Sequence, residues 1–218
     1  MLGDKNPTPV ALNAQVIVNC GAGGSCEGGN PGGVYTFAHV EGIPDSSCEQ
    51  YVAHDPDYNP DIEGCKAIDK CKDCTWPPCP VGQTCQDKCW AVDYKKYYAS
   101  HYYSFSGKDK MKAEIYKNGP ISCGVHATDK FEAYTGGIYK EFFLVPLLNH
   151  EIAVVGWGVD ESTGEEYWIG RNSWGTYWGE NGFFKMSMKD HNDLGITRDC
   201  SAGIPSFTPN SEEPLILQ

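Results

Sequence analysis

The sequence has few basic residues and no long apolar run. Its 17 Lys and Arg stand against 29 Asp and Glu, which gives a net charge of −12 and a pI near 4.8. Because binding to nucleic-acid phosphates needs clustered Lys and Arg, this balance excludes nucleic acid as an expected partner. No stretch reaches the roughly 20 apolar residues of a transmembrane helix, so we expect no membrane span. The acidity indicates solubility and identifies no partner.

The N-terminus also lacks the features of a secretory signal. MLGDKNPTPVALN contains no basic region followed by an apolar stretch, and the chain has no Asn-x-Ser/Thr site for glycosylation. The cysteine content, by contrast, indicates an exported protein. Eleven cysteines in 218 residues are typical of exported proteins, since cytosolic thiols are kept reduced. We therefore interpret the first residue of this sequence as not the natural N-terminus.

The length allows one large domain or two small ones, and no internal repeat is present. In the first half, Asn30 is typical of an N-cap and predicts a helix over 31–40 that ends before Gly42. Residues 45–90 are expected to be mostly loop, and they hold seven cysteines. A second helix is predicted over 108–117, with Met111 and Ile115 on one face and a stop at Asn118-Gly119-Pro120.

After the second helix the pattern changes to short strands separated by Gly, Asp and Thr turns. The predicted strands are ISCGVHA, GGIYKEF, HEIAVVGW, EYWIGRN and GFFKMSM. We therefore expect a loop-and-helix domain over residues 1–105, a β domain over 106–209 and a flexible tail over 210–218.

Two motifs in the β domain indicate chemistry: NHEIAVVGWG at 149–158 and YWIGRNSWGTYWGENG at 167–182. His150 can serve as a general base. The amide oxygen of Asn172 can accept the imidazole N–H and fix its tautomer, and Trp174 beside that bond would exclude water. A lone His is more often structural, and the second motif is what favours catalysis.

These motifs resemble those of the papain-like cysteine peptidases, in which N-S-W-G-x-x-W-G surrounds the catalytic Asn. AQVIVNCG at 14–21 and GSCEGG at 24–29 resemble further segments of the family, and the likeness extends over roughly residues 8–208. Within the family, CGAGGSCEGGN, EGIPDSSC and KAEIYKNGPISCG are similar to the cathepsin X branch, also called cathepsin Z, which acts as a carboxypeptidase.

The resemblance implies an α+β fold of two domains, a helix-and-loop left domain and an antiparallel, barrel-like right domain that bears His150 and Asn172. It implies a thiol-dependent hydrolase without cofactor or metal, whose partners are peptide or protein substrates and, in the complete protein, a pro-segment or an inhibitor. It also implies a lysosomal or extracellular location. Gly28 and Gly29 would line a strip that binds substrate backbone, with Glu151 and Trp174 as further substrate contacts.

The expected nucleophile is missing from the sequence. In the papain group the His follows the Cys by about 130–150 residues, which places the nucleophile near or before residue 1. Cys20 lacks the family's C-G-S-C-W context. Cys26 lies in a glycine loop before Glu27, whose charge would raise the thiol pKa. The oxyanion-hole Gln and the left domain's central helix are also absent. We expect this chain to be a truncated form, inactive alone and unstable or partly molten.

The resemblance also implies a disulfide pattern. The pairs carried over are Cys20–Cys65, Cys48–Cys71, Cys74–Cys89 and Cys123–Cys200, while Cys79 and Cys85 could close a loop of their own. Cys26 remains unpaired, because its family partner lies in the missing segment. A zinc cluster built on Cys71 and Cys74 is the alternative for residues 65–89, and an exported chain favours disulfides.

Two other residues near the site have open interpretations. Strand alternation turns Glu151 away from the imidazole. A solvated charge is the favoured interpretation, and a carboxylate in the substrate pocket that prefers basic side chains is the alternative. His126 lies on a strand near the same pocket and is expected to be structural.

Two hypotheses for function follow. The first is a cysteine peptidase whose nucleophile lies outside this chain. The second is a non-catalytic pseudopeptidase that binds peptides or a protein partner. The retention of His150, Asn172, Trp174 and both glycines favours the first.

Overall fold

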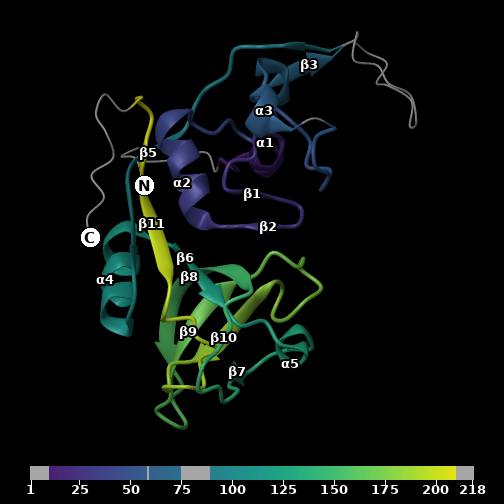
Figure 1. Ribbon diagram of the computed structural model, residues 1–218. Coiled ribbons are helices and arrows are strands. Elements are labelled where there is room, and N and C mark those ends of the chain that lie inside the picture. The colour runs from purple at the N-terminus through teal and green to yellow at the C-terminus, as the bar shows by residue number, and fades with distance from the viewer. Residues whose placement is uncertain (1–9, 58, 75–88, 210–218) are drawn as a thin grey trace. The chain divides into compact units, whose positions relative to one another are not determined.

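The computed structural model describes residues 10–57, 59–74 and 89–209, which form two compact units (Figure 1). Of the described residues, those up to Tyr102 and 203–209 belong to the first unit, and Tyr103–Ala202 belong to the second. The chain passes between the units within two strands, β5 (Tyr98–Phe105) and β11 (Cys200–Ser206). The fold is α+β, with short helices and one large sheet.

Short helices dominate the first unit: α1 (Ala14–Asn19), α2 (Pro31–Val40), α3 (Pro60–Glu63) and the 3-10 turn η1 (Ala67–Asp69). The helix predicted after Asn30 is confirmed as α2. The Asn30 side chain accepts a hydrogen bond from the Gly33 N–H, and Pro31 occupies the first turn, where its missing N–H costs nothing. Gly42 follows the end of α2 with φ of 75°, a conformation that favours glycine.

The strands of the first unit are short pairs. β1 (Gly24–Ser25) pairs antiparallel with β2 (Gly28–Gly29), and β3 (Lys72–Cys74) pairs with β4 (Cys89–Ala91). The buried core is correspondingly small. Ala38, Ile43 and Ala99 form a buried cluster with half-buried apolar side chains of α1 and α2 packed against it, and Val16, Ala22, Cys48 and Cys71 are buried outside this cluster.

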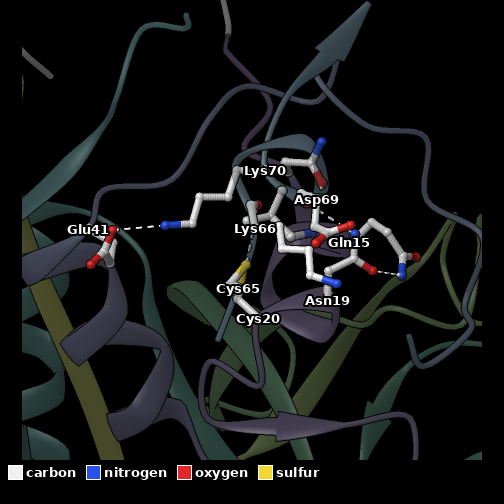
Figure 2. The surroundings of a disulfide bond; sticks show 10 residues. Gln15, Asn19, Cys20, Glu41, Cys65, Lys66, Asp69 and Lys70 are labelled. Carbon is white, nitrogen blue, oxygen red and sulfur yellow. Dashed lines mark hydrogen bonds and ion pairs between the residues drawn. A yellow bond between two sulfur atoms is a disulfide. The ribbon is translucent and has the colours of Figure 1, made fainter. Parts of the chain in front are cut away.

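Polar contacts supplement this small core around the Cys20–Cys65 disulfide (Figure 2). The buried Gln15 side chain donates to Asn19 Oδ1 at 2.9 Å, and Asn19 donates in turn to the Asp69 carbonyl at 3.1 Å. These bonds join α1 to η1 beside the disulfide. Buried amides that have hydrogen-bond partners favour one arrangement of the loops. They matter here because few apolar contacts stabilise these loops.

A seven-stranded sheet organises the second unit, in the order β5-β11-β6-β8-β9-β10-β7. Besides β5 and β11, the sheet contains β6 (Ile121–Val125), β7 (Ile138–Tyr139), β8 (His150–Val159), β9 (Glu166–Arg171) and β10 (Phe183–Ser187). The five strands predicted from alternation are all present. Strands β6, β8, β9 and β10 pair antiparallel in succession.

Large side chains fill the core of this unit. Phe131, Trp168 and Phe184 are fully buried, and Phe131 meets the Phe184 ring edge-on at 5.2 Å. Helix α4 (Lys108–Asn118) packs on β6 and β8 through the buried Met111 and Ile115, as its pattern predicted. Helix α5 (Asp129–Glu132) contributes Phe131 and begins at Thr128, whose hydroxyl caps it.

Two features of the sheet differ from the sequence-based expectation. First, β7 pairs parallel with β10, and in the described residues no pairing closes the sheet into a barrel. Second, β5 and β11 were not predicted. Gly203 and Pro205 weaken the strand signal of β11, because Pro is confined to special positions in a sheet.

Four disulfides occur in the described part of the chain: Cys20–Cys65, Cys48–Cys71, Cys74–Cys89 and Cys123–Cys200. They are four of the pairs that the family resemblance implied, and Cys79–Cys85 lies outside the described residues. Cys71 and Cys74, the strongest candidates for a zinc pair, are each bonded to another cysteine. Their sulfurs are therefore not thiolate ligands.

The described helices are short. None of them combines the length and the apolar content needed to cross a membrane.

Candidate active site

His150 and Asn172 lie together in the second unit, each at the end of a strand. His150 is the first residue of β8, and Asn172 follows the last residue of β9. Because β8 and β9 are adjacent antiparallel strands, residues 22 apart in the sequence become neighbours. His150 Nε2 lies 2.8 Å from Asn172 Oδ1.

The hydrogen bonds of Asn172 determine the tautomer of His150. The Ser173 backbone N–H donates to the same Asn172 atom at 2.8 Å. Only an oxygen can accept from a backbone N–H, so the atom that faces His150 is the amide oxygen. His150 Nε2 must then carry the proton and donate it, which leaves a lone pair on Nδ1. The imidazole is therefore oriented as a base through Nδ1.

Trp174 covers this hydrogen bond. Its ring stacks on the His150 imidazole with centroids 4.7 Å apart and an interplanar angle of 26°. Trp174 in turn packs against Phe131 and Trp178 of the core. An indole face beside the imidazole excludes water, strengthens the bond to Asn172 and stabilises a positive charge on the ring. Trp174 thus contacts the base directly, and its predicted role in substrate binding stays a prediction.

The turn after Asn172 holds its backbone in place. The Asn172 N–H donates to the Gly182 carbonyl at 2.9 Å, and the Trp178 indole N–H donates to the Glu132 carbonyl at 2.8 Å. At Gly179, φ is 56° and an added Cβ would lie 2.6 Å from the Phe183 carbonyl oxygen. Only glycine fits there, which explains the second glycine of the W-G-x-x-W-G pattern.

Glu151 lies on the face of β8 opposite the core. Side chains alternate between the two faces of the strand: Ile152 and Val154 are buried, whereas Glu151 is exposed. Desolvation by the surrounding strands raises the pKa of Glu151 to about 7; the Ser122 hydroxyl opposes the rise and Asp199 adds to it.

His126 lies just beyond β6, and its ring meets Phe143 edge-on at 4.5 Å. Its Nδ1 is buried and has no hydrogen-bond partner among the described residues. Packing against Phe143 is the contact that the structure shows for this ring.

The second unit, which holds His150, contains no free thiol. Among residues 103–202 both cysteines are consumed by the Cys123–Cys200 disulfide. Cys26, in the first unit, is free and exposed. Slight desolvation, the charge and hydrogen bond of Asp55 and the charge of Glu27 all raise the pKa of the Cys26 thiol. A nucleophilic thiolate needs the opposite environment.

Gly28 and Gly29 form the second strand of the exposed β1–β2 hairpin. A Cβ at Gly29 would lie 2.3 Å from the Gly23 carbonyl oxygen, whereas one at Gly28 would meet nothing within 4 Å. Gly29 is thus required by the hairpin itself, apart from any ligand. The predicted role of both glycines in binding substrate backbone stays a prediction.

A His-Asn pair at two strand ends, with Asn172 buried and Trp174 stacked on His150, on an α+β scaffold, is typical of cysteine-type hydrolases. The comparisons agree. The family described as papain family cysteine protease matches residues 3–204, and the chain belongs to this family. The two residues that the motifs singled out, His150 and Asn172, are hydrogen-bonded to each other in the structure.

Two relatives and one solved structure illustrate the relationship. The chain is 43% identical over 199 residues to cathepsin Z of Onchocerca volvulus, covering 88% of this chain, and 30% identical over 202 residues to cathepsin B-like protease 1 of Arabidopsis thaliana, covering 90%. Procathepsin B S9 from Trypanosoma congolense superposes with a TM-score of 0.68 at 26% identity, covering 93% of this chain and 62% of that one. The chain spans 59% and 50% of the length of the two sequence relatives.

Proposed function

We propose that the complete protein is a cysteine peptidase and that this chain supplies its general base, His150, and its orienting residue, Asn172. The observation that carries the proposal is the 2.8 Å contact between His150 Nε2 and Asn172 Oδ1 under the Trp174 ring. This arrangement leaves Nδ1 as the proton acceptor. Membership of the papain family supports the same chemistry.

In the proposed reaction, His150 Nδ1 takes the proton of a cysteine thiol, and the thiolate sulfur attacks the carbonyl carbon of a peptide bond. The imidazolium then returns the proton to the amine nitrogen as the C–N bond breaks, which leaves a thioester. Water, deprotonated by His150, hydrolyses the thioester and restores the thiol. Asn172 and Trp174 stabilise the transient imidazolium.

We place the nucleophile outside this 218-residue chain. Cys20 is bonded to Cys65, Cys123 is bonded to Cys200, and the pKa of Cys26 is raised. On this proposal the 218-residue chain alone has no peptidase activity. Turnover of a C-terminally free dipeptide by the chain alone would contradict the placement of the nucleophile.

The decisive experiment compares His150→Ala and Asn172→Ala in the full product of the gene, obtained by reading the coding DNA upstream of Met1. Loss of the base is expected to lower kcat roughly 10²- to 10⁴-fold, and loss of the orienting amide to lower kcat with little change in KM. The control is His101→Ala, because His101 is exposed and lies in the first unit. Equal activity of His150→Ala and His101→Ala would overturn the proposal.

We propose further that the activity is that of a carboxypeptidase, as the cathepsin X resemblance implies. Gly28 and Gly29 would bind substrate backbone, and Glu151 and Trp174 would contact side chains. A carboxypeptidase cleaves peptides with a free C-terminus and spares the matching C-terminal amides. Equal rates on the two would leave a cysteine peptidase of another specificity.

Partners and location follow from the same proposal. The likeness to a procathepsin supports a pro-segment that covers the site in the complete protein, and a protein inhibitor would bind the same face. The four disulfides support a lysosomal or extracellular location, because disulfides persist in oxidising compartments.

One surface supports the alternative function, a peptide- or protein-binding pseudopeptidase. Phe142, Leu144, Val145 and Leu147, just before His150, are 66–75% exposed. Exposed apolar patches mark interaction sites on protein surfaces. Persistent peptide binding by the full gene product, without cleavage and without a C-G-S-C-W segment in its coding sequence, would favour this alternative.

A further inference from the structure

Glu141, the second residue after β7, binds two hydroxyl groups with one carboxylate oxygen. Its Oε2 accepts from the Thr128 hydroxyl at 2.7 Å and from the Tyr139 hydroxyl at 2.6 Å, and its Oε1 lies 3.1 Å from the Lys130 ammonium. The Glu141 side chain is only 14% exposed, whereas that of Lys130 is 78% exposed. Because an exposed ammonium contributes little to such a pair, the two hydroxyls are the contacts that matter.

The protonation states make Glu141 the acceptor of both bonds. Burial raises the pKa of Glu141, but the Tyr139 and Thr128 hydroxyls and the Lys130 ammonium lower the pKa below its ordinary value. Burial and the hydrogen bond to Glu141 raise the pKa of Tyr139 to about 12. At neutral pH the carboxylate is therefore ionised and the phenol keeps its proton. Hydrogen bonds to an ionised acceptor are roughly twice as strong as those between neutral groups.

Both residues that donate to Glu141 also contact Phe131. Thr128 caps α5 by accepting from the Phe131 N–H at 3.1 Å, so it fixes the backbone that carries the Phe131 ring. The Tyr139 ring meets the Phe131 ring edge-on, with the centroids 5.2 Å apart. Glu141 is thus bonded both to the cap of the helix that carries Phe131 and to a ring that packs against it.

Phe131 supports the indole that covers the base. Its side chain is fully buried, and its ring lies 6.0 Å from the Trp174 ring, which stacks on the His150 imidazole at 4.7 Å. A close-packed core transmits displacements, because it has few voids that absorb them. A base must also be held within about half an ångström of its productive position. A displaced Phe131 would therefore shift Trp174 and loosen the shielded bond between His150 and Asn172.

We propose that Glu141 is a positioning residue for the base: by fixing Thr128 and Tyr139 around Phe131, it keeps Trp174 packed against His150. Glu141 acts through packed side chains and needs no contact with substrate. The proposal rests on the proposed function only in taking His150 as the base, because the contacts themselves involve no nucleophile.

The test follows the His150 ring by NMR in the full 218-residue chain with isotope-labelled histidine. Glu141→Ala removes the acceptor of both hydroxyls, whereas Glu141→Gln keeps an oxygen that can accept from both and loses the charge. The matched control is Glu165→Ala. Glu165 also binds a hydroxyl and an ammonium, those of Ser187 at 2.8 Å and Lys140 at 2.7 Å, but it precedes β9 at the end of the β8–β9 pair opposite His150.

Three readouts separate positioning from general stability. Solvent exchange of the His150 Nε2 proton reports the bond to Asn172. The chemical shifts of the His150 ring C–H protons report the stacked face of Trp174 through its ring current. Amide exchange at Val154, which is buried in the middle of β8, reports the stability of the sheet.

We expect Glu141→Ala to speed exchange of the His150 ring proton about fivefold or more, with Val154 changed less than about twofold, because local opening does not require unfolding of the sheet. The ring C–H shifts should move toward those of free histidine. Glu141→Gln should stay within about twofold of the unsubstituted chain, since it keeps the hydrogen-bond acceptor. Glu165→Ala should leave the His150 ring unchanged.

Equal ring exchange in Glu141→Ala and Glu165→Ala would overturn the proposal, as would equal acceleration of the ring and Val154, which a purely structural role requires. Exchange as fast in Glu141→Gln as in Glu141→Ala would also overturn it, because the acceptor would then not be the cause.

If Glu141→Ala does not fold, Tyr139→Phe decides, because it keeps the ring that packs on Phe131 and removes one hydroxyl. Ring exchange faster than in Glu165→Ala then supports the proposal, and an equal rate overturns it. Failure of the full gene product to cleave peptides would contradict the proposed function and leave these ring measurements unaffected.

Discussion

At the scale of single residues, the motifs carry most of the information about the site. The segment around His150 and the segment around Asn172 each predict one partner of the pair, because the fold constrains both residues locally. Strand alternation also predicts that Glu151 points away from the imidazole, and Glu151 is exposed whereas Ile152 and Val154 are buried. Its neighbours Ser122 and Asp199 could not be predicted, since they come from other segments of the chain.

Glu151 yields a prediction about pH. Its pKa of about 7 in the folded chain exceeds the value of about 4.3 for an exposed Glu. Between these values the folded state keeps the proton and the unfolded state has lost it, so stability falls as pH rises through this window. Glu151→Gln cannot ionise, and its Tm should therefore fall less than that of the parent chain between about pH 4.5 and pH 7.

Thermal unfolding by circular dichroism at several pH values checks this. Glu161→Gln is the control, because Glu161 is exposed in a turn of the same unit and should follow the parent chain. Parallel Tm profiles for Glu151→Gln and the parent would show that Glu151 is an ordinary solvated carboxylate.

At the scale of elements, capping and periodicity predicted the two longer helices. Asn30 and Pro31 specify where α2 begins, and the buried pair Met111 and Ile115 specifies the inner face of α4. Strand β5 was missed because it lies in the half of the chain dominated by loops, and β11 because its glycine and proline weaken the strand signal. Both lie at one edge of the sheet, and their position there depends on hydrogen bonding to strands from distant parts of the sequence.

Helix α2 offers a test at this scale. The Asn30 side chain accepts from the Gly33 N–H at 2.9 Å, and Asn30→Ala leaves that N–H without its cap. The expected loss is about 1 kcal/mol of unfolding free energy in the first unit. Asn30→Ser, which can cap equally well, should be nearly neutral. Urea unfolding followed by amide exchange in α2 measures both, and an equal effect of the two substitutions would rule out capping as the cause.

At the scale of the whole molecule, the two units are stabilised differently. The first has only a small buried cluster, Ala38, Ile43 and Ala99, and carries three of the described disulfides, whereas the second has an extensive aromatic core. Disulfides compensate for a small core by restricting the unfolded chain. The predicted instability of the chain therefore concerns the first unit.

Reduction with dithiothreitol should separate the two units. Each disulfide of the first unit contributes about 3 to 4 kcal/mol in the loop-entropy description, so reduction should make residues up to Tyr102 sensitive to protease. The second unit should stay resistant, because Cys123 and Cys200 are 0% and 1% exposed. Limited proteolysis with mass spectrometry measures both, and simultaneous loss of both units would show that they form a single cooperative structure.

The sequence by itself determined the family, the two predicted helices, the five predicted strands and the two motifs that carry His150 and Asn172. Each of these depends on residues close together in the chain, where periodicity, capping and short motifs act. The tertiary structure alone decided the open sheet with its parallel β7, the tautomer of His150, the raised pKa of Glu151 and the contacts of Glu141 with Thr128 and Tyr139. These depend on which distant segments pair, and the free energy of pairing is distributed over whole strands rather than encoded in any one motif.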